Sequence, residues 1–171
     1  MKKLTLIFFT FLMVLTFKSF GQKLEVNKTD DFTKKSVKQT SWETLFQTFK
    51  DMAYFRISVT DTTATFDLKF QNNKLNTSVK GDQLIFAMDN GQVVTLTNLE
   101  DAFSCRGCGA RGMNGSGTLG IQMSFALTKD QIQKLKTGKI TKMRIGFATG
   151  AFDEDVKEKN AEKIPAALNL L

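Results

Sequence analysis

The sequence contains no histidine, and this absence excludes several kinds of chemistry. Without an imidazole, the chain cannot build the Ser-His-Asp or Cys-His arrangements that activate a nucleophile. Paired carboxylates do occur, at Asp30–Asp31 and Asp153–Asp155, but a turn and the start of a helix explain them. The sequence therefore offers no catalytic residues, which favours a non-enzymatic protein, and it predicts no cofactor.

Proline is almost absent too, because Pro165 is the only one in the chain. No Pro-rich linker, low-complexity tract or internal repeat interrupts the sequence. Residues 22–171 have a length close to the commonest size of a single domain, and a chain of this length can bury a core without the help of disulfides or a structural metal. We therefore expect a single β-rich globular domain over residues 22–171.

Long hydrophobic runs are missing everywhere except at the N-terminus. There, two lysines precede an apolar run over residues 4–17, and Ser19 and Gly21 place small side chains where a signal peptidase cleaves. The run is shorter than the ~20 residues that a membrane-spanning helix needs. We therefore predict a signal peptide at residues 1–21, a periplasmic or extracellular location, and no transmembrane segment after cleavage.

The chain is basic, with a formal net charge of +7, but the predicted signal peptide carries three of its lysines. The mature chain is then mildly basic, which favours an anionic glycan or an envelope protein as partner. Nucleic acid is not expected, since it needs a concentrated footprint of Lys and Arg. One stretch forms a basic edge, which is either a solvated face or an anion-binding surface: Lys129, Lys134, Lys136, Lys139, Lys142 and Arg144.

Alternation of apolar and polar residues predicts antiparallel strands over most of the chain. The pattern is clearest at residues 53–59, 66–70, 84–88, 93–97, 121–127 and 139–147, with shorter strands near 24–27 and 75–79. Asn90-Gly91 between two of these runs predicts a hairpin with a type I′ turn, because both residues tolerate positive φ. We therefore expect an α+β protein, predominantly an antiparallel β-sheet or sandwich with two or three short helices.

The first predicted helix spans about two turns and ends near Lys50. Thr40 and Glu43 fit a capping box, with the hydroxyl residue at the cap and the carboxylate three positions on. The apolar residues that follow have the spacing of one helix face: Trp42, Leu45, Phe46 and Phe49. We expect these four side chains to lie in the core rather than to form an aromatic binding platform.

Two more helices are expected in the last third of the chain. Thr128 and Gln131 form a second capping box, and Gly138 is expected at the C′ position that ends this helix. Asp153–Asp155 fit the start of the last helix, since carboxylates favour the positive end of its dipole. Its inner side is expected to hold Val156, Asn160, Ile164 and Ala167. Pro165 predicts a break there, because proline removes a donor and clashes one turn back.

Residues 105–120 stand out from the rest, because they hold both cysteines and six of the twelve glycines. Exported thiols usually pair in an oxidising compartment, so we favour a structural disulfide between Cys105 and Cys108 that rigidifies a turn. A second hypothesis is a redox-active pair, in which Arg106 and Arg111 lower the pKa of an attacking thiolate. A third is a metal site, although two cysteines fill only half of a tetrahedral zinc centre.

The Cys-x-x-Cys spacing resembles that of thioredoxin-like oxidoreductases, and residues 105–112 resemble one unit of the cysteine-rich module of DnaJ-type chaperones. In the first family a helix follows the pair, whereas Gly107, Gly109 and Gly112 disfavour a helix here. The second family repeats its pattern, whereas this chain has it once. We therefore predict no metal, and we regard the three glycines and the two arginines as loop residues of a candidate site.

The chain combines an export signal, Trp42, Asn90-Gly91, the Cys105–Cys108 pair and a strand–helix ending over residues 139–158. In this combination it is similar to small secreted β-rich proteins of unassigned function in Bacteroidetes-type bacteria. The resemblance spans the chain and implies no activity. We expect a non-enzymatic binding or structural protein of the cell envelope. The alternative is a thiol–disulfide redox protein that acts through Cys105 and Cys108.

Overall fold

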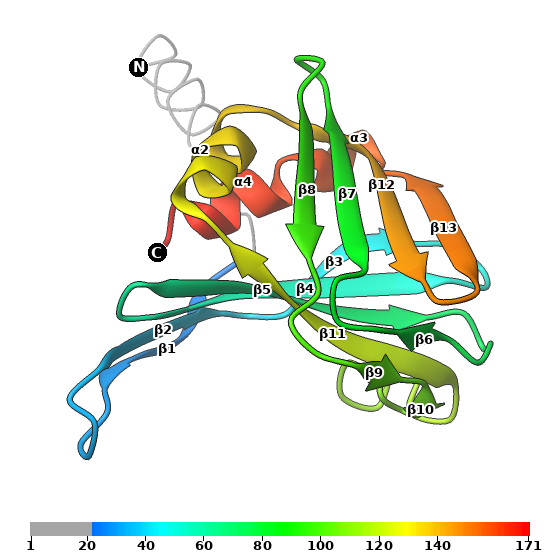
Figure 1. Cartoon of the computed structure of the whole chain (residues 1–171), viewed down its shortest axis with the longest axis horizontal. Coiled ribbons are helices and arrows are strands. Elements are labelled where there is room, and N and C mark those ends of the chain that lie inside the picture. The colour runs from blue at the N-terminus through cyan, green and yellow to red at the C-terminus, as the bar shows by residue number, and fades with distance from the viewer. Residues whose placement is uncertain (1–21) are drawn as a thin grey trace, which may run out of the picture.

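The computed structural model describes residues 22–171, in which antiparallel strands are the main elements (Figure 1). The predicted signal peptide at residues 1–21 lies outside the described residues. The larger sheet, sheet A, has the strand order β1-β2-β4-β5-β11-β10, and β3 pairs with β4 along the same edge as β2. Its strands are β1 (Leu24–Thr29), β2 (Ser36–Thr40), β3 (Glu43–Gln47), β4 (Met52–Thr60), β5 (Thr63–Gln71), β10 (Cys105–Arg106) and β11 (Leu119–Leu127).

A second sheet, sheet C, has the order β13-β12-β7-β8, and a short sheet B pairs β6 with β9. Their strands are β6 (Thr77–Ser78), β7 (Gln83–Met88), β8 (Val93–Thr97), β9 (Ala102–Phe103), β12 (Ile140–Phe147) and β13 (Gly150–Asp155). The runs with period-two alternation thus form strands, because each can bury one face and expose the other. The prediction of a predominantly antiparallel β-rich protein is confirmed.

The hairpin predicted at Asn90-Gly91 joins β7 to β8, but its turn differs from the expected type I′. Only Gly91 has a positive φ, of 78°, whereas Asn90 does not. The Gly91 N–H donates to the Met88 carbonyl at 3.1 Å, and the Met88 N–H donates to the Gln92 carbonyl at 3.0 Å. These bonds define a type I turn followed by a left-handed glycine, the usual three-residue hairpin loop.

Helix α2 (Lys129–Thr137) begins at the predicted capping box of Thr128 and Gln131. The Gln131 side chain also donates to the Thr95 carbonyl at 2.7 Å, which ties the helix to β8. Gly138 ends the helix as expected, although it occupies the C-cap rather than the C′ position and has an extended backbone (φ −140°). A Cβ at Gly138 would lie 2.8 Å from the methyl group of Met88, so the end of that flexible side chain would have to shift to accommodate it.

The C-terminal segment forms two short helices, α3 (Glu158–Ala161) and α4 (Lys163–Leu168). The break expected near Pro165 therefore exists, and it falls at Glu162. Pro165 sits in the first turn of α4, where a missing N–H costs no intrahelical bond. The side chains predicted to face inward are buried: Val156, Asn160, Ile164 and Ala167.

The helix predicted to end near Lys50 is wrong, because these residues form strand β3. A β-bulge between Thr44 and Phe46 lets the neighbouring Leu45 and Phe46 both be buried, so the apolar spacing imitates a helix face. Thr40 does not cap a helix; its hydroxyl oxygen accepts the Ile57 N–H at 2.9 Å. Phe49 is fully exposed rather than in the core.

Asp153–Asp155 do not begin a helix either, because they lie in strand β13. Arg144 of β12 stands directly opposite Asp153 and binds it through two hydrogen bonds of 2.6 Å. This pair raises the pKa of Arg144 and lowers that of Asp153, mainly through its hydrogen bonds. Cross-strand charge pairing, rather than a helix dipole, accounts for this acidic run.

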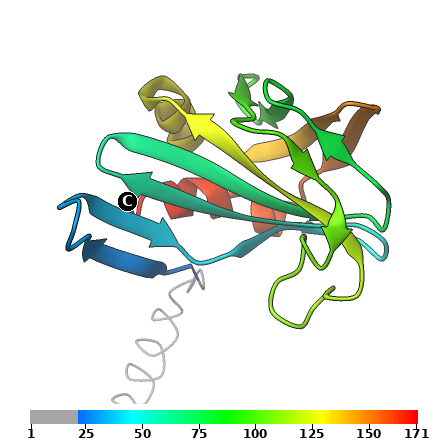
Figure 2. The same cartoon turned by 60° about the horizontal axis from the view of Figure 1, so that its bottom comes forward.

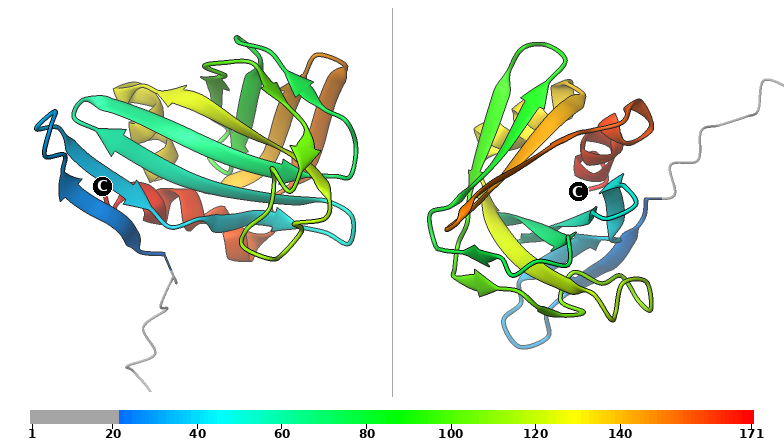
Figure 3. Two further views of the ribbon diagram at one scale, coloured as in Figure 1. Left: turned by 90° about the horizontal axis from the view of Figure 1, so that it is seen from below. Right: turned by 90° about the vertical axis from the view of Figure 1, so that its right-hand side faces the viewer.

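Sheet C and the helices all lie on one side of sheet A, and the hydrophobic core fills the space between them (Figure 1 and Figure 3). Helix α2 contacts β8 and α4, and α4 contacts β4. Phe70 of sheet A joins the two sheets, because its ring centroid lies 4.7 Å from that of Phe152 and 5.8 Å from that of Phe147, both in sheet C. The opposite face of sheet A is therefore free for other contacts.

A candidate anion-binding site beside the disulfide-closed loop

The glycine-rich segment between β10 and β11 forms a loop on the face of sheet A that points away from the core (Figure 2). The two flanking strands pair through Cys105 with Gly120 and Arg106 with Leu119. A disulfide joins Cys105 to Cys108 at the base of the loop, so the predicted pairing of the two cysteines is confirmed. Since both cysteines are oxidised, neither provides a thiolate in this state.

Three side chains of the outer face hold the loop in place. Lys69 donates to the Ala110 carbonyl at 3.0 Å, and Gln71 donates to the Gly115 carbonyl at 2.7 Å. Asn114 donates its amide to the Tyr54 hydroxyl at 2.9 Å. Lys69 and Gln71 alternate along β5 with core residues, so they face outward and anchor the loop to the rigid centre of the sheet.

The predicted loop glycines have two structural roles. Gly107 and Gly112 adopt positive φ values of 78° and 59°, in which an L side chain is strained. Position 109 requires glycine for a different reason, since an added Cβ would lie only 2.6 Å from the Phe70 carbonyl oxygen. The loop therefore needs glycine both to turn and to lie close to the backbone of β5.

The two loop arginines differ in their surroundings, although both are exposed. Arg106 donates to the Gly117 carbonyl at 3.2 Å and so bridges the loop internally. Arg111 pairs through its backbone with Asn114, and its side chain makes no hydrogen bond or ion pair with any residue in the described range 22–171. Arg111 is thus a cation that is fixed at its backbone and free at its guanidinium group.

Trp42 also lies on this outer face, partly buried, and not in the core as predicted. The guanidinium carbon of Arg56 is 4.6 Å from the centre of the indole ring, and the ammonium nitrogen of Lys69 is 4.4 Å from it. Such cation–π contacts favour a cation over an aromatic face. Burial, followed by repulsion from Arg56, lowers the pKa of Lys69. The indole and these cations form a rigid base beside the loop.

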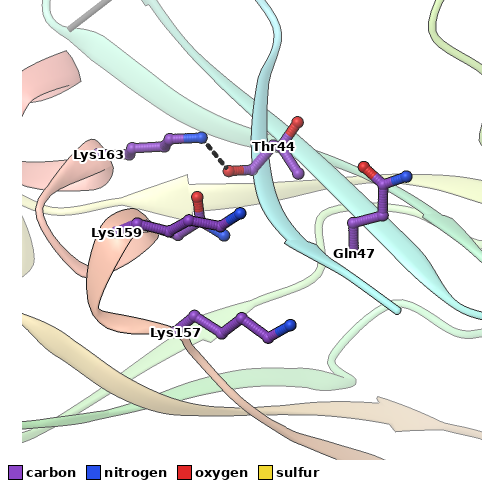
Figure 4. A pocket seen from close by; sticks show the side chains of 6 residues that line it. Thr44, Gln47, Lys157, Lys159 and Lys163 are labelled. Carbon is purple, nitrogen blue, oxygen red and sulfur yellow. Dashed lines mark hydrogen bonds between the residues drawn. The ribbon is translucent and has the colours of Figure 1, made fainter. Parts of the chain in front are cut away.

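A cavity of about 370 Å³ lies between β3 and the C-terminal helices, and we call it the lysine pocket (Figure 4). Its lining comprises Thr44, Gln47, Lys157, Lys159, Asn160 and Lys163. The three lysine side chains extend from the C-terminal segment toward β3, as Figure 4 shows. The pocket therefore brings three positive charges to the edge of sheet A.

The two innermost polar groups of the pocket are Lys163 and Asn160. The Lys163 ammonium donates to the Thr44 carbonyl at 3.0 Å. Asn160 is only 4 % exposed, and its side chain lines the pocket. Its amide can offer both a donor and an acceptor to a ligand there.

Burial and nearby charges together determine the pKa of Lys163 in the pocket. Burial is the largest cause that lowers the pKa of Lys163, while the Glu43 carboxylate opposes the shift. Repulsion from Lys159 and Arg111 lowers this pKa further. The Arg111 guanidinium of the loop is therefore close enough to the lysine pocket to influence its charge.

Sequence reasoning missed this pocket because it assigned the basic surface to residues 129–144. Much of that charge is neutralised by ion pairs: Lys134 with Asp130, Lys139 with Glu162, Lys142 with Asp155 and Arg144 with Asp153. In contrast, none of the three pocket lysines forms an ion pair with another described residue. The pocket therefore gathers three lysines that no described carboxylate neutralises through an ion pair.

No protein-family model matches the chain, and neither a curated protein nor a solved structure matches it. Within residues 22–171, no group of three or more His, Cys, Asp or Glu side chains is placed to hold a metal ion. None of the helices in this range is both long and apolar enough to span a bilayer. The functional argument therefore rests on the geometry of the pocket and the loop.

Proposed function

We propose that this protein is an exported, non-enzymatic binding protein of the cell envelope that takes an anionic glycan in the lysine pocket. The observation that carries the proposal is the convergence of Lys157, Lys159 and Lys163 on one cavity that is also lined by Asn160. An acid group there would relieve the mutual repulsion of the ammonium groups. The amides of Gln47 and Asn160 match the hydroxyl groups of a sugar.

The size of the pocket supports a small ligand or one end of a longer chain. A volume of about 370 Å³ lies at the lower end of the range of small-molecule sites, roughly 300–1,000 Å³. The proposed export is supported by the leader-like sequence at residues 1–21 and by the Cys105–Cys108 disulfide, since disulfides persist in oxidising compartments. The two sheets on either side of one core support an α+β, sandwich-like fold class.

Removing two pocket charges is expected to lower the affinity for an acidic oligosaccharide about tenfold or more. A pair of unit charges 4 Å apart contributes between about 1 kcal/mol in bulk water and about 4 kcal/mol near a protein surface, and 1.4 kcal/mol is a factor of ten. The variant is Lys159→Gln with Lys163→Gln. Isothermal titration calorimetry with trigalacturonate at low salt measures the change.

The matched control is the double variant Lys35→Gln with Lys129→Gln, which removes the same charge from exposed positions outside the pocket lining. Its affinity is expected to stay within about twofold of the wild type, because distant surface charges are screened. An equal loss in both double variants would contradict the proposal, as would a wild-type protein that binds no acidic ligand. Retention of the fold is checked by thermal unfolding of each variant.

The affinity for the anion is expected to fall as the pH rises from 7 toward 10. Because burial lowers the pKa of Lys163, this group loses its proton at a lower pH than an ordinary lysine does. The facing charged groups are Lys157, Lys159, Glu43 and Arg111. Lys163→Arg keeps the charge across this range, so its affinity is expected to decline less steeply. Titrations of both proteins at several pH values test this, and identical pH profiles would contradict it.

A further inference from the structure

The glycine-rich loop and the lysine pocket meet at strand β3. Thr44, which lines the pocket, stands directly opposite Tyr54 of β4, so the two side chains share the outer face of sheet A. The Tyr54 hydroxyl accepts the Asn114 amide of the loop. One residue pair of the sheet thus connects the wall of the pocket to the anchor of the loop.

Arg111 lies between two fixed points of this loop. On one side, the Ala110 carbonyl is bound by Lys69, which itself packs over the Trp42 ring. On the other side, Asn114 is bound to Tyr54 and also exchanges backbone hydrogen bonds of 3.2 and 3.3 Å with Arg111. The backbone of Arg111 is therefore held in place although its side chain is exposed. A guanidinium group on a fixed backbone is suited to binding an acid group, since it presents several donors in one plane.

We infer that Arg111 supplies a fourth cation to the lysine pocket, and that the site therefore selects ligands with two or more acid groups over mono-anions. The inference rests on the proposed function, because it concerns the same pocket. One acid group would lie between the pocket lysines and the Asn160 amide. A second acid group of the same ligand would reach out of the pocket to the guanidinium group. The repulsion that Arg111 exerts on Lys163 is consistent with this proximity.

The competing structural explanation is that Arg111 only solubilises the loop. An arginine with that role would form no part of a selective site, and replacing it would have no larger effect on any anion than replacing the exposed Arg106 has. The pocket lysines and Arg111 come from segments far apart in the sequence, and they approach each other only because the loop folds across the sheet. A selective loss for multi-anionic ligands separates the two explanations.

The test compares Arg111→Gln with Arg106→Gln in the full mature protein. Arg106 is the matched control, because it is an exposed arginine of the same loop region whose guanidinium group is engaged with Gly117. Affinities are measured for galacturonate and trigalacturonate, and for inorganic phosphate and tripolyphosphate. Of the two probes with three acid groups, trigalacturonate and tripolyphosphate, the one that binds the wild type more tightly is expected to bind Arg111→Gln about fivefold to tenfold more weakly. The affinity for the corresponding probe with one acid group is expected to change less than twofold. Arg106→Gln is expected to leave both affinities unchanged.

The two pairs of probes identify the chemistry of the acid group. Selectivity for trigalacturonate indicates a carboxylated glycan, and selectivity for tripolyphosphate indicates a phosphorylated ligand; either result supports the role of Arg111. The inference is overturned if Arg111→Gln binds the trivalent probe as tightly as the wild type does, or if it loses mono-acid and trivalent binding equally. If these results occur while the pocket lysine variant still loses affinity, the proposed function stands and only the role of Arg111 fails.

Discussion

Replacing Phe70 by alanine is expected to lower the free energy of unfolding by about 3–5 kcal/mol. Phe70 is fully buried, and its ring lies within 6.2 Å, centroid to centroid, of Phe46, Phe147 and Phe152. Two of these rings belong to sheet C, so the substitution leaves a cavity at the contact between the two sheets. Its neighbours are held by strand pairing and cannot close that cavity fully, which places the expected cost in the upper part of the range for core truncations.

Urea denaturation followed by tryptophan fluorescence or circular dichroism measures this change. Phe49→Ala is the matched control, because Phe49 has the same side chain but is fully exposed in the turn after β3. We expect the control to change stability by less than about 0.5 kcal/mol. Similar losses in both variants would contradict the assignment of Phe70 to the contact between the sheets.

Replacing Arg56 by methionine is expected to destabilise the fold by about 3 kcal/mol. Arg56 binds Asp67 through a hydrogen bond of 2.8 Å, and the Asp67 side chain is only 9 % exposed. The Ser124 hydroxyl also donates to this carboxylate, at 2.8 Å. Without the guanidinium group, a nearly buried negative charge keeps hydroxyl donors but loses its counter-ion. The cation over the Trp42 ring is lost as well.

A comparison within the molecule isolates the effect of burial. Arg144 and Asp153 form an equivalent cross-strand pair in sheet C, but their side chains are 56 % and 41 % exposed. Arg144→Met is therefore expected to destabilise the fold much less than Arg56→Met does. Adding Asp67→Asn to Arg56→Met should recover part of the loss, because the amide carries no charge to leave unpaired. Equal costs for Arg56→Met and Arg144→Met would show that burial of Asp67 does not govern the effect.

The strands were predictable from the sequence because each strand buries one face. Burial of one face requires apolar and polar residues to alternate along the strand, and this alternation is visible in the sequence. The helix predicted from Trp42 onward failed for a physical reason. The bulge beside Phe46 turns two adjacent apolar residues inward, which a regular strand does not do and a helix does. Trp42 and Phe49 completed the apparent helix face by coincidence, since one lies over cations on the outer face and the other is exposed.

The candidate site was predictable only in part. The Cys105–Cys108 disulfide follows from the spacing of the only two cysteines, and Arg111 was recognised as a loop candidate. The lysine pocket has no local signature, because Thr44 and Lys163 are separated by 119 residues and meet only after the sheet and the helices pack. The dense run of basic residues at 129–144 was predicted instead, but carboxylates of the same helix or of neighbouring elements pair with Lys134, Lys139 and Lys142. Pairing in space, rather than density along the chain, decides which charges remain available to a ligand.

Strand β1 forms one border of sheet A, and its form bears on how the protein avoids aggregation. An open sheet border is a template on which further chains can stack into fibrils. Here the register is interrupted by a bulge between Leu24 and Val26, and the side chains of Glu25 and Lys28 are exposed. An irregular backbone and charges of both signs oppose the flat, in-register stacking that amyloid requires. The border that could recruit another copy of the chain is therefore protected by its own local structure.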